Sequence, residues 1–166
     1  MSEYTVEVNV AAWVEKVREQ SIAYQRRQTV EITLNTIAMI APLNRKLFLK
    51  GGLLMGLAYH SPRQTMDIDL TAALAPENNS DERIRRLLDE TFPRAAAVLG
   101  YADLIVKTHS VKCRPKKTPF ANAQFPALEL KITSAKRGTS QEQTLKEGKT
   151  SFTIDVDISF NEPPLQ

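Results

Sequence analysis

The sequence predicts an α+β fold, in which a mixed sheet of about five strands has helices packed on one face. Near the N-terminus, apolar residues recur three or four positions apart, which is typical of helices. Later segments are short apolar or alternating runs, which are typical of strands. The 166 residues suffice for one core. We therefore expect a single domain over 1–166, helical over 1–42 and built on a sheet over 43–166.

Two amphipathic helices are predicted in the N-terminal region. The first covers Val10 to Val17 and the second covers Val30 to Ala41, each with apolar residues three or four positions apart. Pro42 follows directly and favours an end to the second helix, because proline cannot supply a backbone N–H.

A strand, a turn, a short helix and a second strand are predicted next. The apolar run 47–49 is typical of a buried strand, and the glycine pair at 51 and 52 interrupts it. Residues 53–59 favour a short helix. In 66–70, apolar residues alternate with two aspartates, which predicts a strand with one apolar and one acidic face.

The remainder predicts one helix and three strands. Asn79 and Glu82 have the spacing of a capping box, which would open a helix that runs toward Gly100. The stretches at 115–121 and 136–149 are polar or basic and are expected to be loops. The three predicted strands cover 102–113, 127–133 and 152–160.

The formal net charge of +3 is too small to indicate a general nucleic-acid binder. Positive charge is concentrated in 107–117, which holds five of the 22 basic residues and no acid. This segment either follows an RNA backbone or is a solvated hairpin. No apolar stretch approaches the ~20 residues of a membrane span, and the single Cys113 excludes an internal disulfide. We expect a cytoplasmic protein.

Asp67 and Asp69 are the first candidate site. On a strand their side chains leave the same face, with Cα atoms about 6.6 Å apart. Aspartate is disfavoured in strands and like charges on one face repel, so the pair favours a bound cation over two ordinary solvent-facing residues. Asp155 and Asp157 repeat the arrangement. Nucleotidyl transfer uses two Mg²⁺ ions about 3.5–4 Å apart, and such carboxylates suit them.

The turn Lys50-Gly51-Gly52 is the second candidate site. Glycines at a strand-to-helix turn let the backbone approach a phosphate closely, and the N–H groups that begin the next helix attract anions. Lys50 would contact a triphosphate or pair with a neighbouring carboxylate.

Together these two segments resemble the abortive-infection nucleotidyltransferases of the AbiEii/AbiGii toxin family, which belong to the DNA polymerase β-like superfamily. The family pattern is K-G-G, a short helix, then R-x-[ST]-x-D-[IL]-D. It is matched at Lys50, Gly51, Gly52, Arg63, Thr65, Asp67 and Asp69.

The resemblance extends over about 45–163. The stretch 156–163 is similar to the strand that supplies the third carboxylate of the family, which implies that Asp157 is the third metal ligand, with Asp155 as its neighbour.

The resemblance implies a polymerase β-like palm that moves a nucleoside monophosphate from an NTP to a hydroxyl of RNA, at a tRNA 3′ end, or of a protein. Asp67, Asp69 and Asp157 would hold two Mg²⁺, and the nucleotide would contact Lys50, Gly51, Gly52, Arg63 and Thr65. The chain would be the toxin of a toxin–antitoxin pair, with an antitoxin protein as a partner.

The sequence departs from the family pattern at two places. Leu53 follows the glycine pair where members often have Thr or Ser. The chain also ends nine residues after Asp157, so the helical C-terminal region of the family is absent. The expectation is a fragment, or a partner chain that completes the enzyme. The alternatives are a catalytically silent module that binds nucleotide or a protein partner, and a structural domain with chance carboxylates.

Overall fold

The computed structural model describes residues 9–51, 53, 67–116 and 118–161, and its centre is a five-stranded mixed sheet. The order of the strands is β1-β2-β5-β4-β3. The predicted α+β class and the five strands are confirmed. The strands are β1 (Leu47–Lys50), β2 (Ile68–Ala72), β3 (Leu104–Arg114), β4 (Ala127–Lys136) and β5 (Ile154–Phe160).

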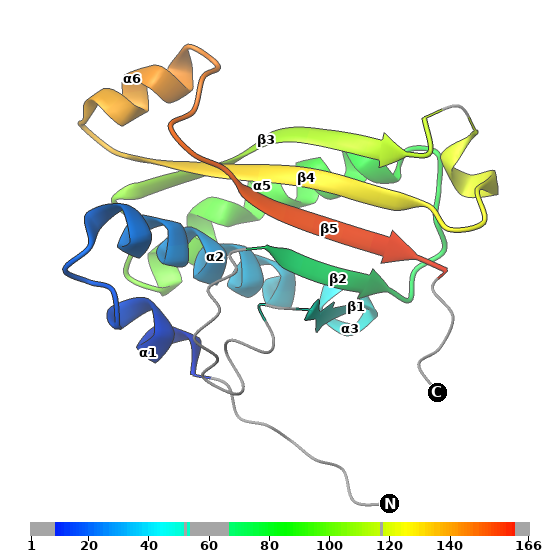
Figure 1. Cartoon of the computed structure of the whole chain (residues 1–166), viewed down its shortest axis with the longest axis horizontal. Helices are drawn as coiled ribbons and strands as arrows, with labels where there is room; N and C mark the ends of the chain where they lie inside the picture. Colours follow the sequence, from blue (N-terminus) through cyan, green and yellow to red (C-terminus); the bar gives the residue numbers. More distant parts are fainter. Residues whose placement is uncertain (1–8, 52, 54–66, 117, 162–166) are drawn as a thin grey trace, which may run out of the picture.

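Helices cover one face of this sheet. Figure 1 shows α2 and α5 behind the strands, and none of the described helices lies in front of the strands in this view. None of the helices in the described ranges combines the length and apolar character needed to cross a bilayer. The helical elements are α1 (Val10–Glu15), α2 (Ser21–Met39), α3 (Leu43–Lys46), α5 (Ser80–Val98), the 3₁₀ helix η1 (Phe120–Asn122) and α6 (Ser140–Lys146).

The pair β2–β5 is parallel, whereas the other three strand pairs are antiparallel. In the parallel pair Ile68 lies opposite Val156, and Leu70 lies opposite Ile158. All four side chains are at most 2% exposed, because they face α2 and α5. Successive side chains alternate between the faces of a strand, so the residues between them face away from the helices.

The helix α2 begins nine residues before the predicted start at Val30. Its first half is polar and therefore lacks an apolar helical pattern, yet hydrogen bonds to β4 allow it to be buried. The Nε2 of Gln25 donates to the carbonyl oxygen and the Oγ of Ser134, at 3.3 and 3.1 Å. The hydroxyls of Thr29 and Ser134 are 2.7 Å apart.

Several boundaries differ from the prediction. The capping box is wrong, because the Asn79 side chain makes no cap hydrogen bond to α5. Ser80 Oγ instead accepts the Glu77 N–H at 2.8 Å. The two predicted loops contain η1 and α6, both of which are too short for a clear apolar period. The predicted helix 53–59 falls, apart from Leu53, outside the described residues.

The edge strand β3 contains a bulge. Its register against β4 shifts between Thr108 and Ser110, so His109 is the additional residue. Thr108 is 0% exposed, and its hydroxyl has no hydrogen-bond partner among the described residues. Thr133, on β4, is equally buried, but its hydroxyl donates to the Phe152 carbonyl at 2.8 Å.

We predict opposite effects for removal of these two hydroxyls. Thr108→Val should raise the free energy of unfolding by about 1 kcal/mol, since it removes an unpaired buried hydroxyl, whereas Thr133→Val should lower it by about 1–3 kcal/mol. Urea denaturation of both variants measures the difference. Equal losses of stability would contradict the description of the bulge.

Candidate active site

The register of the strands aligns one charged residue from each strand in a single row across the sheet. Lys50 lies opposite Asp69, Asp69 opposite Asp157, Asp157 opposite Glu129, and Glu129 opposite Lys112. Neighbouring strands are about 4.8 Å apart. Because residues that lie opposite each other share a face, the row lies on the sheet face away from α2 and α5.

Asp69 and Asp157 occupy the centre of this row. The pKa of Asp157 is raised, first by burial and then by the charges of Asp69 and Glu129, while Arg114 acts in the opposite direction. Neither Asp69 nor Asp157 forms an ion pair with another described residue. Two unpaired carboxylates on adjacent strands repel each other, and a cation between them would remove that repulsion.

Asp67 lies directly before β2, whereas the predicted strand included it. Residue 66, the predicted start of that strand, lies outside the described residues. Asp67 is exposed. Partial burial of its carboxyl group raises its pKa, and so do the nearby charges of Asp155 and Asp69, whereas Lys131 acts in the opposite direction. The two predicted acidic pairs therefore meet on one face of the sheet.

Basic neighbours neutralise the other two acids of this face. Lys131 Nζ lies 2.8 Å from Asp155 Oδ1, and Arg114 Nε lies 2.8 Å from Glu129 Oε1. This pairing distinguishes Asp155 from Asp157, because only Asp155 has an ion-pair partner among the described residues. Glu129 and Lys131 were missed as members of this face, although their alternation along the predicted strand 127–133 was a usable signal.

Gly51 follows β1 and lies against Asp69. Its φ of +81° is a left-handed conformation that favours glycine. A Cβ at this position would overlap Asp69 Oδ2 and lie 3.2 Å from Asp69 Cγ. The turn thus brings the backbone next to a carboxylate of the row, which requires the absence of a side chain at Gly51.

The other predicted nucleotide contacts fall only partly within the described residues. Lys50 is the last residue of β1, directly before Gly51. Leu53, at the position where the family often has a hydroxyl, is 1% exposed and packs in the core. Gly52, Arg63 and Thr65 lie outside the described residues.

The carboxylate face fits a divalent cation by its donor chemistry, since Mg²⁺ prefers carboxylate oxygens. The charges of Asp69 and Glu129 also contribute to the raised pKa of Asp157, as expected where carboxylates lie close together. Within the described ranges, no three His, Cys, Asp or Glu side chains are already gathered as a metal site.

Cys113 takes no part in this face. It packs against the core on the helix side of β3. Burial raises the pKa of the thiol, and so does the carboxylate of Asp81 on α5, which also hydrogen-bonds it.

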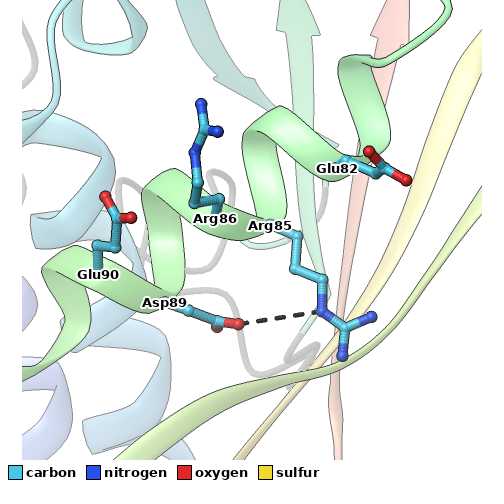
Figure 2. Close-up of a pocket in the computed structure, with 5 residues that line it drawn as sticks. All are labelled: Glu82, Arg85, Arg86, Asp89 and Glu90. Atoms are coloured by element: carbon cyan, nitrogen blue, oxygen red, sulfur yellow. Dashed lines mark ion pairs between the residues drawn. The ribbon is translucent and has the colours of Figure 1, made fainter.

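A cavity of about 420 Å³ on α5 is also outside the site. Figure 2 shows its charged side chains along the helix, with Arg85 directed toward Asp89. Their ion pair measures 3.9 Å between Arg85 Nε and Asp89 Oδ2. Acidic and basic residues both contribute to its lining, so it presents no dominant charge to a ligand. The lining residues are Glu82, Arg85, Arg86, Asp89 and Glu90.

The contact between Gly51 and Asp69 gives a matched prediction. Gly51→Ala and Gly138→Ala both force alanine into a left-handed conformation, at φ +81° and +73°, which costs about 1–2 kcal/mol. No atom lies within 4 Å of a Cβ at Gly138. Gly51→Ala should therefore lose a further 1–3 kcal/mol or so from overpacking against Asp69. Denaturation curves compare the two variants, and equal losses would contradict the close contact.

A search of curated proteins finds no match. The sequence profile of one family, described as nucleotidyl transferase AbiEii toxin, type IV toxin–antitoxin system, matches residues 32–166. The match begins within α2 and includes all five strands and the carboxylate face. The resemblance noted from the sequence motifs is confirmed, and the chain belongs to the AbiEii nucleotidyltransferase toxin family of type IV toxin–antitoxin systems.

Proposed function

We propose that the protein transfers a nucleoside monophosphate from an NTP to a hydroxyl of an RNA acceptor, such as a tRNA 3′ end, or of a protein. The acceptor oxygen forms a bond to the α-phosphorus, and the bond from the α-phosphorus to the pyrophosphate oxygen breaks. The observation that supports this most directly is the pairing of Asp69 with Asp157 beside Gly51.

Asp67, Asp69 and Asp157 are the proposed ligands of two Mg²⁺ ions. When bound, these ions would activate the acceptor hydroxyl and neutralise charge on the departing pyrophosphate. The assignment of Asp157 rather than Asp155 rests on charge, because Lys131 already neutralises Asp155. Asp69 and Asp157 remain available for a cation among the described residues.

The glycine turn is the proposed seat of the β- and γ-phosphates. Gly51 leaves its backbone uncovered next to Asp69, so a phosphate can approach the N–H groups and the carboxylate face together. Lys50 would add positive charge at the same row, and Gly52, Arg63 and Thr65 complete the proposed nucleotide contacts. Positioning and charge neutralisation would then provide the catalysis, without a covalent enzyme intermediate.

In the cell, the proposed role is that of a cytoplasmic toxin. Membership of a type IV toxin–antitoxin family implies an antitoxin partner. The proposed domain organisation is a single palm domain over 1–166, with a helical N-terminal part over 1–42 and the catalytic sheet over 43–166.

A second candidate is a catalytically silent module that binds nucleotide or a protein partner. It is favoured by one observation, namely that no three acidic, His or Cys side chains of the described residues are gathered as a ready metal site. Calorimetric titration of NTP with Mg²⁺ and a labelled-NTP transfer assay separate the candidates. Binding without transfer by the unmodified chain would support the silent module.

Asp157→Asn and Asp155→Asn form a matched pair for the transfer assay. Both aspartates lie on the same face of β5, but only Asp155 has a basic partner among the described residues. Asp157→Asn should reduce transfer of label from NTP to total RNA by about 100-fold or more, as expected for loss of a group that stabilises the transition state. Asp155→Asn should retain most activity.

The same variants separate a catalytic role from a structural one. Asp157→Asn removes repulsion from Asp69 and Glu129, so the melting temperature without metal should be unchanged or higher. If Asp155→Asn abolishes transfer and Asp157→Asn does not, the assignment of the third carboxylate is wrong.

A further inference from the structure

A second cavity, of about 230 Å³, lies at the free edge of β3. Its charged or titratable lining residues are all basic, and it has no acidic lining residue among those described. They are Arg85, Lys107, His109 and Lys149.

The basic residues of this cavity come from three separate segments of the fold. Lys107 and His109 lie on β3 at the bulge, and Lys149 belongs to the segment between α6 and β5. Arg85 comes from α5, and Figure 2 shows its side chain extending from the helix toward the neighbouring strand. Its Nη2 donates to the Thr108 carbonyl oxygen at 3.3 Å, which holds the guanidinium at the edge of β3.

The cavity carries net positive charge. Lys107, His109 and Lys149 are exposed, and none of them forms an ion pair with another described residue. Asp89 supplies a counter-charge to Arg85 at 3.9 Å and accepts the Thr108 N–H at 2.9 Å. One carboxylate thus offsets one guanidinium, and the two lysines remain uncompensated within the described ranges.

Lys107 lies on the same face of the sheet as the carboxylate row. It lies opposite Thr133, and Lys112 lies opposite Glu129, four residues from Thr133 on β4. Residues an even number apart on a strand share a face. Along β4, Glu129 and Thr133 are about 13 Å apart, and Lys112 and Lys107 are therefore separated by about the same distance. Across the sheet, two strand spacings of about 4.8 Å lead from Lys112 on β3 to Asp157 on β5.

We infer that this cavity binds a backbone phosphate of the RNA acceptor, and that Lys112 contacts a further phosphate nearer the carboxylates. The inference rests on the proposed function, in which the acceptor is RNA. Positive groups about 13 Å apart along one strand suit a chain of regularly spaced phosphates, whereas a single free phosphate could occupy only one of them.

The double variant Lys107→Ala/Lys149→Ala tests the site in the full chain. Its affinity for a fluorescein-labelled single-stranded RNA of 20 nucleotides is measured by anisotropy at several salt concentrations. We expect at least about tenfold weaker binding at low salt and a shallower salt dependence, by about 0.7 in the slope of log K for each lost phosphate contact. Lys107→Arg/Lys149→Arg keeps the charges and should bind like the unmodified protein.

The control is Lys16→Ala/Arg94→Ala, which removes two exposed positive charges from α1's C-terminal end and from α5. It should bind RNA nearly as well as the unmodified chain. Equal weakening of both double variants, or no weakening of the first, would overturn the site.

Two competitors identify the ligand. Inorganic phosphate at the same total charge should displace RNA poorly; equally effective displacement would indicate a free-anion site and overturn the inference. Polyglutamate is a probe for an acidic protein partner. If it binds through Lys107 and Lys149 more tightly than RNA does, the RNA assignment is wrong.

Failure of this inference is distinguishable from failure of the proposed function. Asp157→Asn should lose label transfer but keep RNA affinity, whereas Lys107→Ala/Lys149→Ala should weaken RNA affinity and leave Mg²⁺-dependent NTP binding intact. An unmodified chain without transfer activity, but with RNA affinity that depends on the two lysines, would refute the transfer reaction alone.

Discussion

The parallel register of β2 against β5 is the constraint on which the candidate site depends. Ile68 and Leu70 must face the helices beside Val156 and Ile158, and the alternation of side chains then places Asp69 next to Asp157 on the other face. A slip by one residue would turn the acids into the core and the apolar residues outward. The hydrophobic pattern therefore determines the position of the carboxylates as well as the stability of the sheet.

Magnitudes explain why the fold tolerates this repulsion. Burial of one Ile, Leu or Val side chain contributes about 1.5–3 kcal/mol, whereas a pair of residues directly across two strands changes stability by about 0.2–1 kcal/mol. The free energy gained by burying the apolar side chains of β2 and β5 thus exceeds the cost of repulsion between their aspartates. Ion pairs from β4 and β3 compensate Asp155 and Glu129, whereas Asp69 and Asp157 have no ion-pair partner in the part of the chain that the structure describes.

Much of this arrangement could be predicted from the sequence, in the segments where apolar and polar residues alternate regularly. The alternation around Asp69 and Asp157 predicted two strands with acidic faces, and the K-G-G turn with D-x-D predicted the family. The local sequence pattern could not predict elements that depend on contacts with distant parts of the chain. The first half of α2 is buried because Gln25 and Thr29 form hydrogen bonds with Ser134 on β4. Ser134 is 109 and 105 residues away along the chain, so no local periodicity could reveal these bonds. The basic cavity likewise depends on a bulge and on Arg85, which approaches from α5.

We expect Asp69 and Asp157 to share a divalent cation beside Gly51. Crystals grown with Mn²⁺ and a non-hydrolysable NTP test it most directly, because the anomalous signal of manganese locates the ion independently of any activity. We expect an anomalous peak within coordination distance of both carboxylates, with the triphosphate against the glycine turn. A fully occupied nucleotide with no manganese peak at these two aspartates would contradict it.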